Sequence, residues 1–250
     1  MKTSNKLILT ALLLLLIALT AYNYLLKAEY DSGRYKDPDR NYITLKFKDF
    51  DTVDVNSTSA VNVKFIQGPF SVRVDADALG FTKIKQEGRR LKLNAVFERG
   101  YIQNFSPYVV IITCPNLAEV NANATFIAGN KNITDTVYRD DWRMRQNLIE
   151  GFKQDSLSIR QSYGSSIRLS GNHIRILNVV AGLNPRSISN TDILNNNQFQ
   201  WATIDVLNRG KVTLAGKVTQ YLKYHLADSA QMIFTGNAQN IIINSKSYQK

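Results

Sequence analysis

The chain has 250 residues, of which 44% are hydrophobic and 20% are charged, a balance typical of a globular protein and not of a disordered one. Its single cysteine, Cys114, excludes an intramolecular disulfide, and the apolar run around it favours a buried thiol. The net charge of +11 would attract polyanions, but lysine and arginine are scattered and never form a run of four. We therefore expect solvated strand faces and no nucleic-acid partner.

The N-terminal segment is the first element along the chain. Residues 7–26 form a largely apolar stretch that follows Lys2 and Lys6. As a helix, this stretch would be about 30 Å long, the thickness of a bilayer core. The two lysines predict that the N-terminus stays in the cytoplasm and the rest is exported. We expect a retained signal-anchor transmembrane helix at residues 1–28 and a linker at residues 29–42.

The alternative for this segment is a cleaved signal peptide. It would have a long apolar region, and no clear Ala-x-Ala cleavage site follows it. Lipid attachment within the segment is excluded, because it contains no cysteine. Under either interpretation the remaining domain works outside the cytoplasm.

From Tyr42 onwards, apolar residues alternate with a period of two in short runs that end in turn-forming residues. Examples are Ile204-x-Val206, which precedes Asn208-Arg209-Gly210, and Val61-x-Val63-x-Phe65, which precedes Gln67-Gly68-Pro69. This pattern predicts an all-β domain at residues 43–246. Residues 137–155 interrupt it. We expect an excursion there, either a loop or a short helix with Trp142, Ile149 and Phe152 on one side.

A longer repeat favours one kind of all-β fold. The pattern small or polar, x, apolar, x, apolar, x, Gly ends at Gly171, Gly216 and Gly236, and a looser copy ends at Gly129. These glycines are 42, 45 and 20 residues apart, which is close to multiples of about 21, a period that indicates stacked coils. One expected copy, at Ile188–Thr191, fits loosely. A β-sandwich would also give short strands, but the repeat favours a mainly parallel β-solenoid.

Asparagine is frequent in the C-terminal half, and stacked coils can align asparagine side chains in ladders. The residues concerned are Asn172, Asn178, Asn184, Asn190, Asn195–Asn197, Asn237, Asn240 and Asn244.

Residues Phe50–Leu117 carry a family resemblance. The motifs are Phe50-Asp51-x-Val53-x-Val55, Val61-x-Val63-x-Phe65-x-Gln67-Gly68, Val72-x-Val74, Leu91-x-Leu93 and Val109-x-Ile111-x-Thr113-x-Pro115-x-Leu117. They resemble the head GIN domain family of Bacteroidetes-type bacteria, described broadly as auto-transporter adhesins. The resemblance implies a right-handed, mainly parallel β-solenoid on an exported envelope protein, and no known reaction. The chain departs from the family pattern at Val120–Thr125 and at Val137–Phe152.

Candidate catalytic and metal-binding residues are few. His173 and His225 occupy different places in their coils, and the chain has no HxxxH or CxxC motif, so we expect no metal and no cofactor. Asp75 and Asp77 would share one strand face, and Asp140 and Asp141 lie in the excursion. Such pairs could serve glycoside hydrolysis, but surface solvation explains them equally well. We expect a non-enzymatic protein, with an envelope carbohydrate-active enzyme as the alternative.

Aspartate followed by serine or threonine and then an apolar residue occurs four times. The hydroxyl residues are Thr52, Thr136, Ser156 and Ser229. The pattern resembles the O-glycosylation acceptor of Bacteroidetes, and glycans there would be bulky, solubilising surface groups. The other interpretation is ordinary turn chemistry before a strand.

The leading hypothesis is a membrane-anchored module of the bacterial cell envelope that serves binding, adhesion or structure. It would be held at the inner membrane and face the periplasm or the exterior. Aromatic and cationic side chains on strand faces could contact envelope polysaccharide or another envelope protein. The candidates are Trp201, Arg209, Tyr221, Lys223 and Tyr224. A further alternative is self-assembly through the open ends of the solenoid.

Overall fold

The structure is a computed structural model that describes residues 2–33, 36–37, 39–100, 107–136, 146–185 and 188–238. It divides into two units, residues 1–42 and residues 43–250, which are described separately below.

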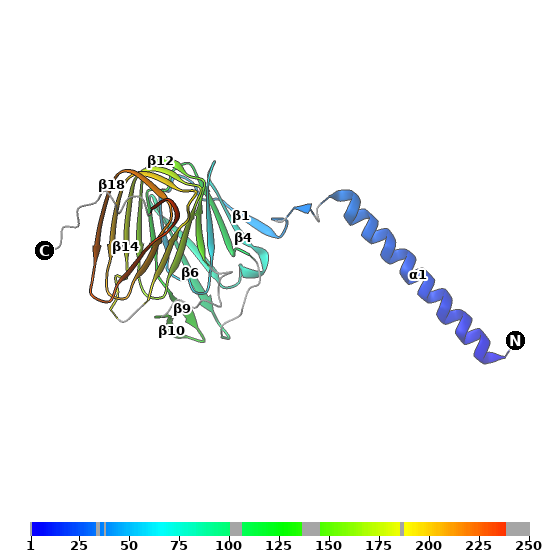
Figure 1. The fold of residues 1–250 in the computed structure, drawn as a ribbon. Helices are drawn as coiled ribbons and strands as arrows, with labels where there is room; N and C mark the ends of the chain where they lie inside the picture. Colours follow the sequence, from blue (N-terminus) through cyan, green and yellow to red (C-terminus); the bar gives the residue numbers. More distant parts are fainter. Residues whose placement is uncertain are drawn as a thin grey trace. The chain divides into compact units, whose positions relative to one another are not determined.

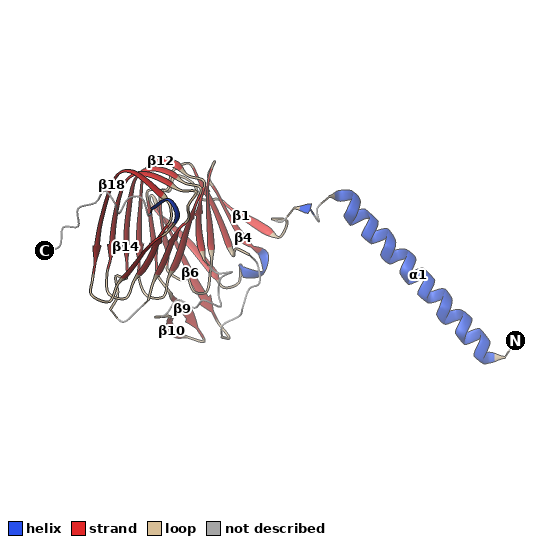
Figure 2. Ribbon diagram, viewed as in Figure 1, coloured by secondary structure: helices blue, strands red, loops and turns tan. Residues whose placement is uncertain are grey.

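The first unit is dominated by one helix, α1 (Thr3–Ser32) (Figure 2). By its length and composition α1 can cross a membrane, and a signal sequence near the N-terminus would meet the same criterion. The hydroxyls of Thr10 and Thr20 donate to the carbonyls of Lys6 and Leu16, so these polar groups are satisfied within the helix. The helix ends at Gly33, which has a φ of 67° and donates its N–H to the carbonyl of Tyr30. The helix therefore extends into the residues expected as a linker.

The second unit consists of two mixed β-sheets with short 3₁₀ turns (Figure 1). Within the described residues, the nine-stranded sheet has the order β1 (Tyr42–Leu45), β4 (Ser71–Asp75), β7 (Val110–Cys114), β3 (Val63–Gln67), β11 (Asn147–Glu150), β13 (Ser166–Ser170), β15 (Asn190–Ile193), β17 (Lys211–Leu214) and β19 (Gln231–Phe234). The ten-stranded sheet has the order β10 (Lys131–Thr134), β9 (Thr125–Ala128), β6 (Arg90–Phe97), β2 (Thr52–Val55), β8 (Glu119–Ala122), β12 (Lys153–Gln161), β14 (His173–Ala181), β16 (Gln198–Val206) and β18 (Lys217–Leu226), with β5 (Thr82–Glu87) paired to β6.

From β11 to β19 the chain alternates between the two sheets, and each strand pairs in parallel with the strand two places later. Asn147 lies opposite Ile167 and Lys211 lies opposite Gln231, both 20 residues further on. Gly171, Gly216 and Gly236 each follow a strand of the nine-stranded sheet, as the repeat predicts. The loosely fitting copy is displaced, since β15 begins at Asn190.

The strands from β1 to β10 do not follow this scheme. Among the strand pairs whose direction is described, three are antiparallel, namely β4 with β7, β5 with β6 and β9 with β10. The interpretation of Gly129 as a copy of the repeat is therefore wrong in position. Gly129 follows β9, which belongs to the ten-stranded sheet and turns back as a tight hairpin into β10. Its φ of 54° serves that turn.

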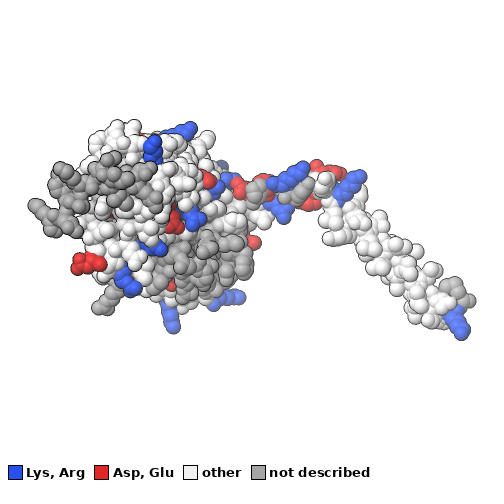
Figure 3. Space-filling model, viewed as in Figure 1, with Lys and Arg blue, Asp and Glu red and all other residues white. Residues whose placement is uncertain are grey.

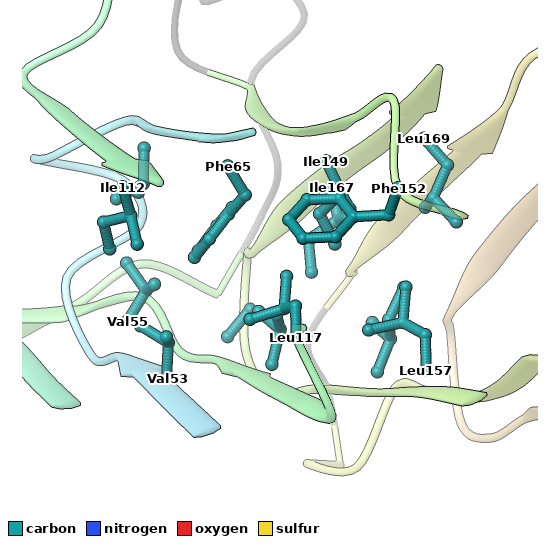
Figure 4. Packing of buried hydrophobic residues seen from close by; sticks show 14 of the residues in the cluster. Val53, Val55, Phe65, Ile112, Leu117, Ile149, Phe152, Leu157, Ile167 and Leu169 are labelled. Carbon is teal, nitrogen blue, oxygen red and sulfur yellow. The ribbon is translucent and has the colours of Figure 1, made fainter. Parts of the chain in front are cut away.

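The hydrophobic core lies between the inward faces of the two sheets. Figure 4 shows Phe65, Ile149 and Leu169 from the nine-stranded sheet opposite Val53 and Leu157 from the ten-stranded sheet, and all five are fully buried. The alternation found in the sequence places these side chains inward, because successive residues of a strand point to opposite faces.

Part of the expected excursion at residues 137–155 is wrong. Asn147–Glu150 form β11, and β12 begins at Lys153. Ile149 and Phe152 are fully buried core residues and do not line one side of a covering helix. Ile149 lies in β11 and Phe152 lies in the turn before β12, and this arrangement buries both side chains without a helix. Trp142 lies outside the described residues.

An asparagine ladder connects the turns that follow β13 and β15 at one edge of the core. The Asn172 side chain donates to the Ile149 carbonyl and to Asn197 Oδ1, both at 2.9 Å, and accepts the N–H of Phe152 at 2.9 Å. Asn197 in turn donates to the carbonyls of Leu169 and Leu194. Both asparagines are fully buried. Their amides therefore satisfy backbone groups that the turns leave without a strand partner.

Candidate functional site

Two exposed aromatic side chains and a partly buried isoleucine lie together on the outer face of the ten-stranded sheet. In the strand register, Ile176 of β14 lies opposite Trp201 of β16, and Trp201 lies opposite Tyr221 of β18. Trp201 is 43% exposed and Tyr221 is 53% exposed. Their ring centroids are 6.0 Å apart and the rings are tilted by 49°. These three residues are called the aromatic patch below.

An irregularity in the strands turns the patch outward. In β14, Ile174 and Leu177 are buried, so both residues between them, Arg175 and Ile176, face outward. The same pattern recurs in β16, where Phe199 and Ala202 are buried and Trp201 is exposed. The register between β16 and β18 also shifts here, which is the mark of a β-bulge. Strict alternation therefore fails at this position, and sequence pattern alone would not place Ile176 in the patch.

The other three predicted contact residues are not brought together with Trp201 and Tyr221 in the same way. Lys223 lies opposite Thr203, on the outward face of β18. Tyr224 lies opposite the buried Ile204, so it faces the core side at the last strand of the sheet, and its ring packs 5.6 Å from that of Phe234. Arg209 is exposed in the turn that follows β16. Tyr221 and Lys223 thus share a face with Trp201, and Tyr224 does not.

The four candidate O-glycosylation residues differ in accessibility. Ser156 is exposed in β12, Thr136 is exposed beyond β10, and Ser229 is exposed in the turn between β18 and β19. Thr52 is partly buried, and its hydroxyl donates to Asp51, which also pairs with Arg89. Glycosylation at these positions stays a prediction, with Thr52 the least accessible of the four.

The proposed pairing of Asp75 with Asp77 on one strand face is wrong. Asp75 ends β4 and is buried, and its side chain accepts the N–H of Asp77 at 2.8 Å as the cap of a short 3₁₀ turn, η2 (Ala76–Ala78). The sequence continues the alternating pattern, but the cap bends the chain after Asp75. Asp140 and Asp141 lie outside the described residues.

The histidines and the cysteine are well separated. His173 begins β14, whereas His225 lies near the end of β18, and the described residues contain no group of three metal-ligating side chains. Cys114 is fully buried, and burial raises the pKa of its thiol to about 12. The thiol is therefore protonated at neutral pH and is a poor nucleophile.

Basic side chains are dispersed over the surface and are partly neutralised. Figure 3 shows lysine and arginine lying singly among uncharged and acidic residues. Several are ion-paired, including Lys64 with Glu150 at 2.8 Å and Arg175 with Asp155. The excess positive charge thus does not form one continuous patch on this face.

No family model matches the chain, and no curated protein matches it. Among solved structures, it is similar to a "putative adhesin" from Bacteroides fragilis, with 11% identity and a TM-score of 0.42, over 79% of this chain and 99% of that one. It is also similar to a "putative lipid binding protein" from Parabacteroides distasonis, with 12% identity and a TM-score of 0.29, over 78% of this chain and 94% of that one.

A "putative adhesin" from the same species matches with 10% identity and a TM-score of 0.31, over 78% of this chain and 94% of that one. The sources of these adhesin-like neighbours are Bacteroidetes. The resemblance to the head GIN domain family itself stays a prediction.

Proposed function

We propose that this protein is a non-enzymatic, membrane-anchored envelope module that binds polysaccharide through the aromatic patch. The observation that supports this is the exposure of Trp201 and Tyr221 side by side on neighbouring strands. Large aromatic side chains are usually buried, so two adjacent exposed rings on a rigid sheet favour a binding role.

The chemistry of the patch fits a sugar polymer. The faces of aromatic rings carry partial negative charge and attract the polarised C–H groups of a pyranose. Neighbouring rings can therefore pack against successive sugar units of a polymer. Lys223 lies two residues along β18 from Tyr221, on the same face, and supplies a positive charge for acidic groups. An extended surface of this kind suits a chain molecule better than a compact ligand.

The location that we propose is the envelope side of the inner membrane. α1 is long and apolar enough to serve as a signal-anchor, and Lys2 and Lys6 before its apolar stretch favour a cytoplasmic N-terminus. The β unit would then lie in the periplasm, within reach of envelope polymers.

We further infer that β11–β19 wind as a right-handed β-solenoid. The support is the parallel pairing at steps near 20 residues and the strong right-handed preference of crossovers between parallel strands. An experimental structure of the intact protein tests this inference, and a left-handed or non-coiling path would refute it.

The binding proposal is tested with the full-length protein in detergent micelles and an immobilised envelope polysaccharide fraction. The Trp201→Ala/Tyr221→Ala double variant should bind at least tenfold more weakly, because exposed aromatic contacts often contribute about 2 kcal/mol each. Ile233→Ala is the matched control, since Ile233 is 39% exposed on β19 of the other sheet. Equal loss in both variants would refute the patch, and retention of binding after the polysaccharide is digested would point to a protein partner.

The anchor and the glycans are tested together by the intact mass of the protein from its native membranes. A mass that includes residues 1–26 supports a retained anchor, whereas loss of this segment shows cleavage. Additional hexose-sized increments that vanish in Ser156→Ala or Ser229→Ala would assign glycosylation, and their absence would return the motif to turn chemistry.

A further inference from the structure

A cavity of about 270 Å³ opens on the outer face of the nine-stranded sheet. Its walls come from three parts of the chain that the strand pairing brings together. Leu148 of β11 and Arg168 of β13 lie opposite one another in register. Tyr108, just before β7, and Leu194, just after β15, complete the apolar part of the lining, and Gln146 and Ser170 supply polar atoms.

The charges around the cavity are not evenly matched. Lys64, opposite Leu148 on β3, is neutralised by Glu150 at 2.8 Å. Arg168 has a weaker partner, because its Nη2 lies 3.5 Å from Asp192 Oδ2. Charge-assisted N–H···O bonds are normally about 2.7–2.9 Å long. One carboxylate at 3.5 Å therefore leaves most of the guanidinium's hydrogen-bonding capacity unused.

The Nε atom of Arg168 supports the same conclusion. It is buried and has no hydrogen-bond partner in the part of the chain that the structure describes. A guanidinium has five N–H donors and no acceptor, and a buried donor without a partner costs stability. Because Nε itself is buried, an anion in the cavity would meet the exposed part of this side chain, which is 39% exposed and whose planar N–H groups match a carboxylate.

The remaining walls indicate what carries the carboxylate. Tyr108 offers an aromatic ring, and its hydroxyl stays protonated because burial raises the pKa of Tyr108. Leu148 and Leu194 offer apolar surface, while Ser170 offers a hydroxyl that also accepts from Asn196 at 3.1 Å. The volume lies just below the usual range for drug-sized ligands, about 300–1,000 Å³. A cavity of this volume can hold one sugar ring and is larger than a two-carbon acid such as acetate would fill.

We propose that this cavity binds an acidic pyranose, with its carboxylate on Arg168, its ring against Tyr108 and its hydroxyls facing Ser170 and Gln146. The site is separate from the aromatic patch, since it lies on the other sheet and uses none of the same residues. It provides a specific contact for a uronic-acid-like unit, whether free or as part of an acidic polymer.

The test uses the full-length protein in detergent micelles, titrated calorimetrically with galacturonic acid, glucose, acetate and a short peptide with a free C-terminal carboxylate. Galacturonic acid should bind at least tenfold more tightly than glucose and than acetate. Arg168→Gln should abolish that difference, and Arg168→Lys, which keeps the charge but not the fork, should weaken binding severalfold. The control Arg175→Gln alters an arginine of the other sheet and should leave the affinity unchanged.

Several results of these titrations would overturn the proposal. Glucose binding as tightly as galacturonic acid would remove the role of the carboxylate, and acetate binding as tightly would reduce the cavity to a general anion site. Tighter binding of the peptide would assign the cavity to a protein partner. If Arg168→Gln fails to fold, Ser170→Val is the second variant, and unchanged affinity there would contradict the assigned pose. The Trp201→Ala/Tyr221→Ala variant should retain galacturonic acid binding, which separates failure of this site from failure of the patch.

Discussion

The two halves of the β unit, strands β1–β10 and strands β11–β19, build the same two sheets through different strand connections. Strands β11–β19 alternate between the sheets, and each pairs in parallel with the strand two places later. Strands β1–β10 include three antiparallel pairs and reach their neighbours by less regular routes. At Gly182 in the second half, one turn lies directly against the backbone of another turn, whereas the hairpin turn at Gly88 in the first half has open space around it. The two halves should therefore differ in how they tolerate changes in their turns.

The largest contrast is expected between two glycine substitutions. Gly182, after β14, has a φ of +80°, and a Cβ there would lie 2.0 Å from the carbonyl oxygen of Leu207, which follows β16. Gly88, in the turn between β5 and β6, has a φ of +60°, but a Cβ there would meet nothing within 4 Å. Gly182→Ala should lower the free energy of unfolding by about 3 kcal/mol or more. Gly88→Ala should cost about 1 kcal/mol. Denaturant titration of both variants measures the difference, and equal losses would contradict the contrast.

Alkylation of Cys114 can test whether the two halves of the β unit unfold together. It lies in β7 of the first half, is fully buried and has a thiol pKa raised to about 12 by burial. Alkylation at pH 8 should therefore require unfolding. In Gly182→Ala, the rate of alkylation should rise about 100-fold, matching a loss of about 3 kcal/mol, if the halves unfold together. An unchanged rate would show that the second half opens independently of β7.

The next largest effect is expected in the asparagine ladder. Asn172→Leu would remove the partners of the Phe152 N–H and the Ile149 carbonyl, both in the core region. Because buried groups without partners cost about 1–3 kcal/mol each, the variant should lose about 2–4 kcal/mol. Hydrogen exchange at the Phe152 amide should also become faster. The matched control is Asn56→Leu in the first half, where the amide donates to the partly buried Asn94 and the loss should stay below about 1 kcal/mol.

The contrast between the halves also explains what the sequence could predict. The repeat that ends at Gly171, Gly216 and Gly236 locates strands of one sheet, because parallel strands that pair at nearly equal steps place equivalent residues at equal intervals. Where hairpins replace coils, the same local pattern has another meaning, as the turn at Gly129 shows. Alternation also finds the core, since inward residues must be apolar. It does not reveal which parallel strand a segment joins.

The candidate sites were less predictable for physical reasons. Trp201 and Tyr221 were predicted as exposed contact residues, but their adjacency depends on a register that no local pattern encodes. Tyr224 was grouped with them, although it lies three residues after Tyr221 and strand alternation alone places it on the opposite face. The cavity at Arg168 joins residues from Tyr108 to Leu194. Such a set becomes visible only when the strands are paired.

The smallest expected effect concerns two surface ion pairs, one in each half. In the first half, hydrogen bonding from Arg89 lowers the pKa of Asp51, and in the second half, hydrogen bonding from Arg175 lowers the pKa of Asp155. A carboxyl with a lowered folded-state pKa contributes stability above its unfolded pKa, near 3.8 for Asp, and that contribution disappears as the pH falls through the folded-state value. Asp51→Asn should thus shift the denaturation midpoint slightly at pH 7, and the shift should become smaller as the pH falls below 3.8.

Asp155→Asn is the companion variant for this comparison. The Asp51 side chain is only 22% exposed, whereas that of Asp155 is 68% exposed and is screened more strongly by solvent. The shift at pH 7 should therefore be smaller for Asp155→Asn than for Asp51→Asn, and raising the salt concentration should reduce both. A larger shift for Asp155→Asn would contradict this order. It would mean that surface charges contribute more to the stability of strands β11–β19 than expected for a half that is held together by a buried asparagine ladder and close turn contacts.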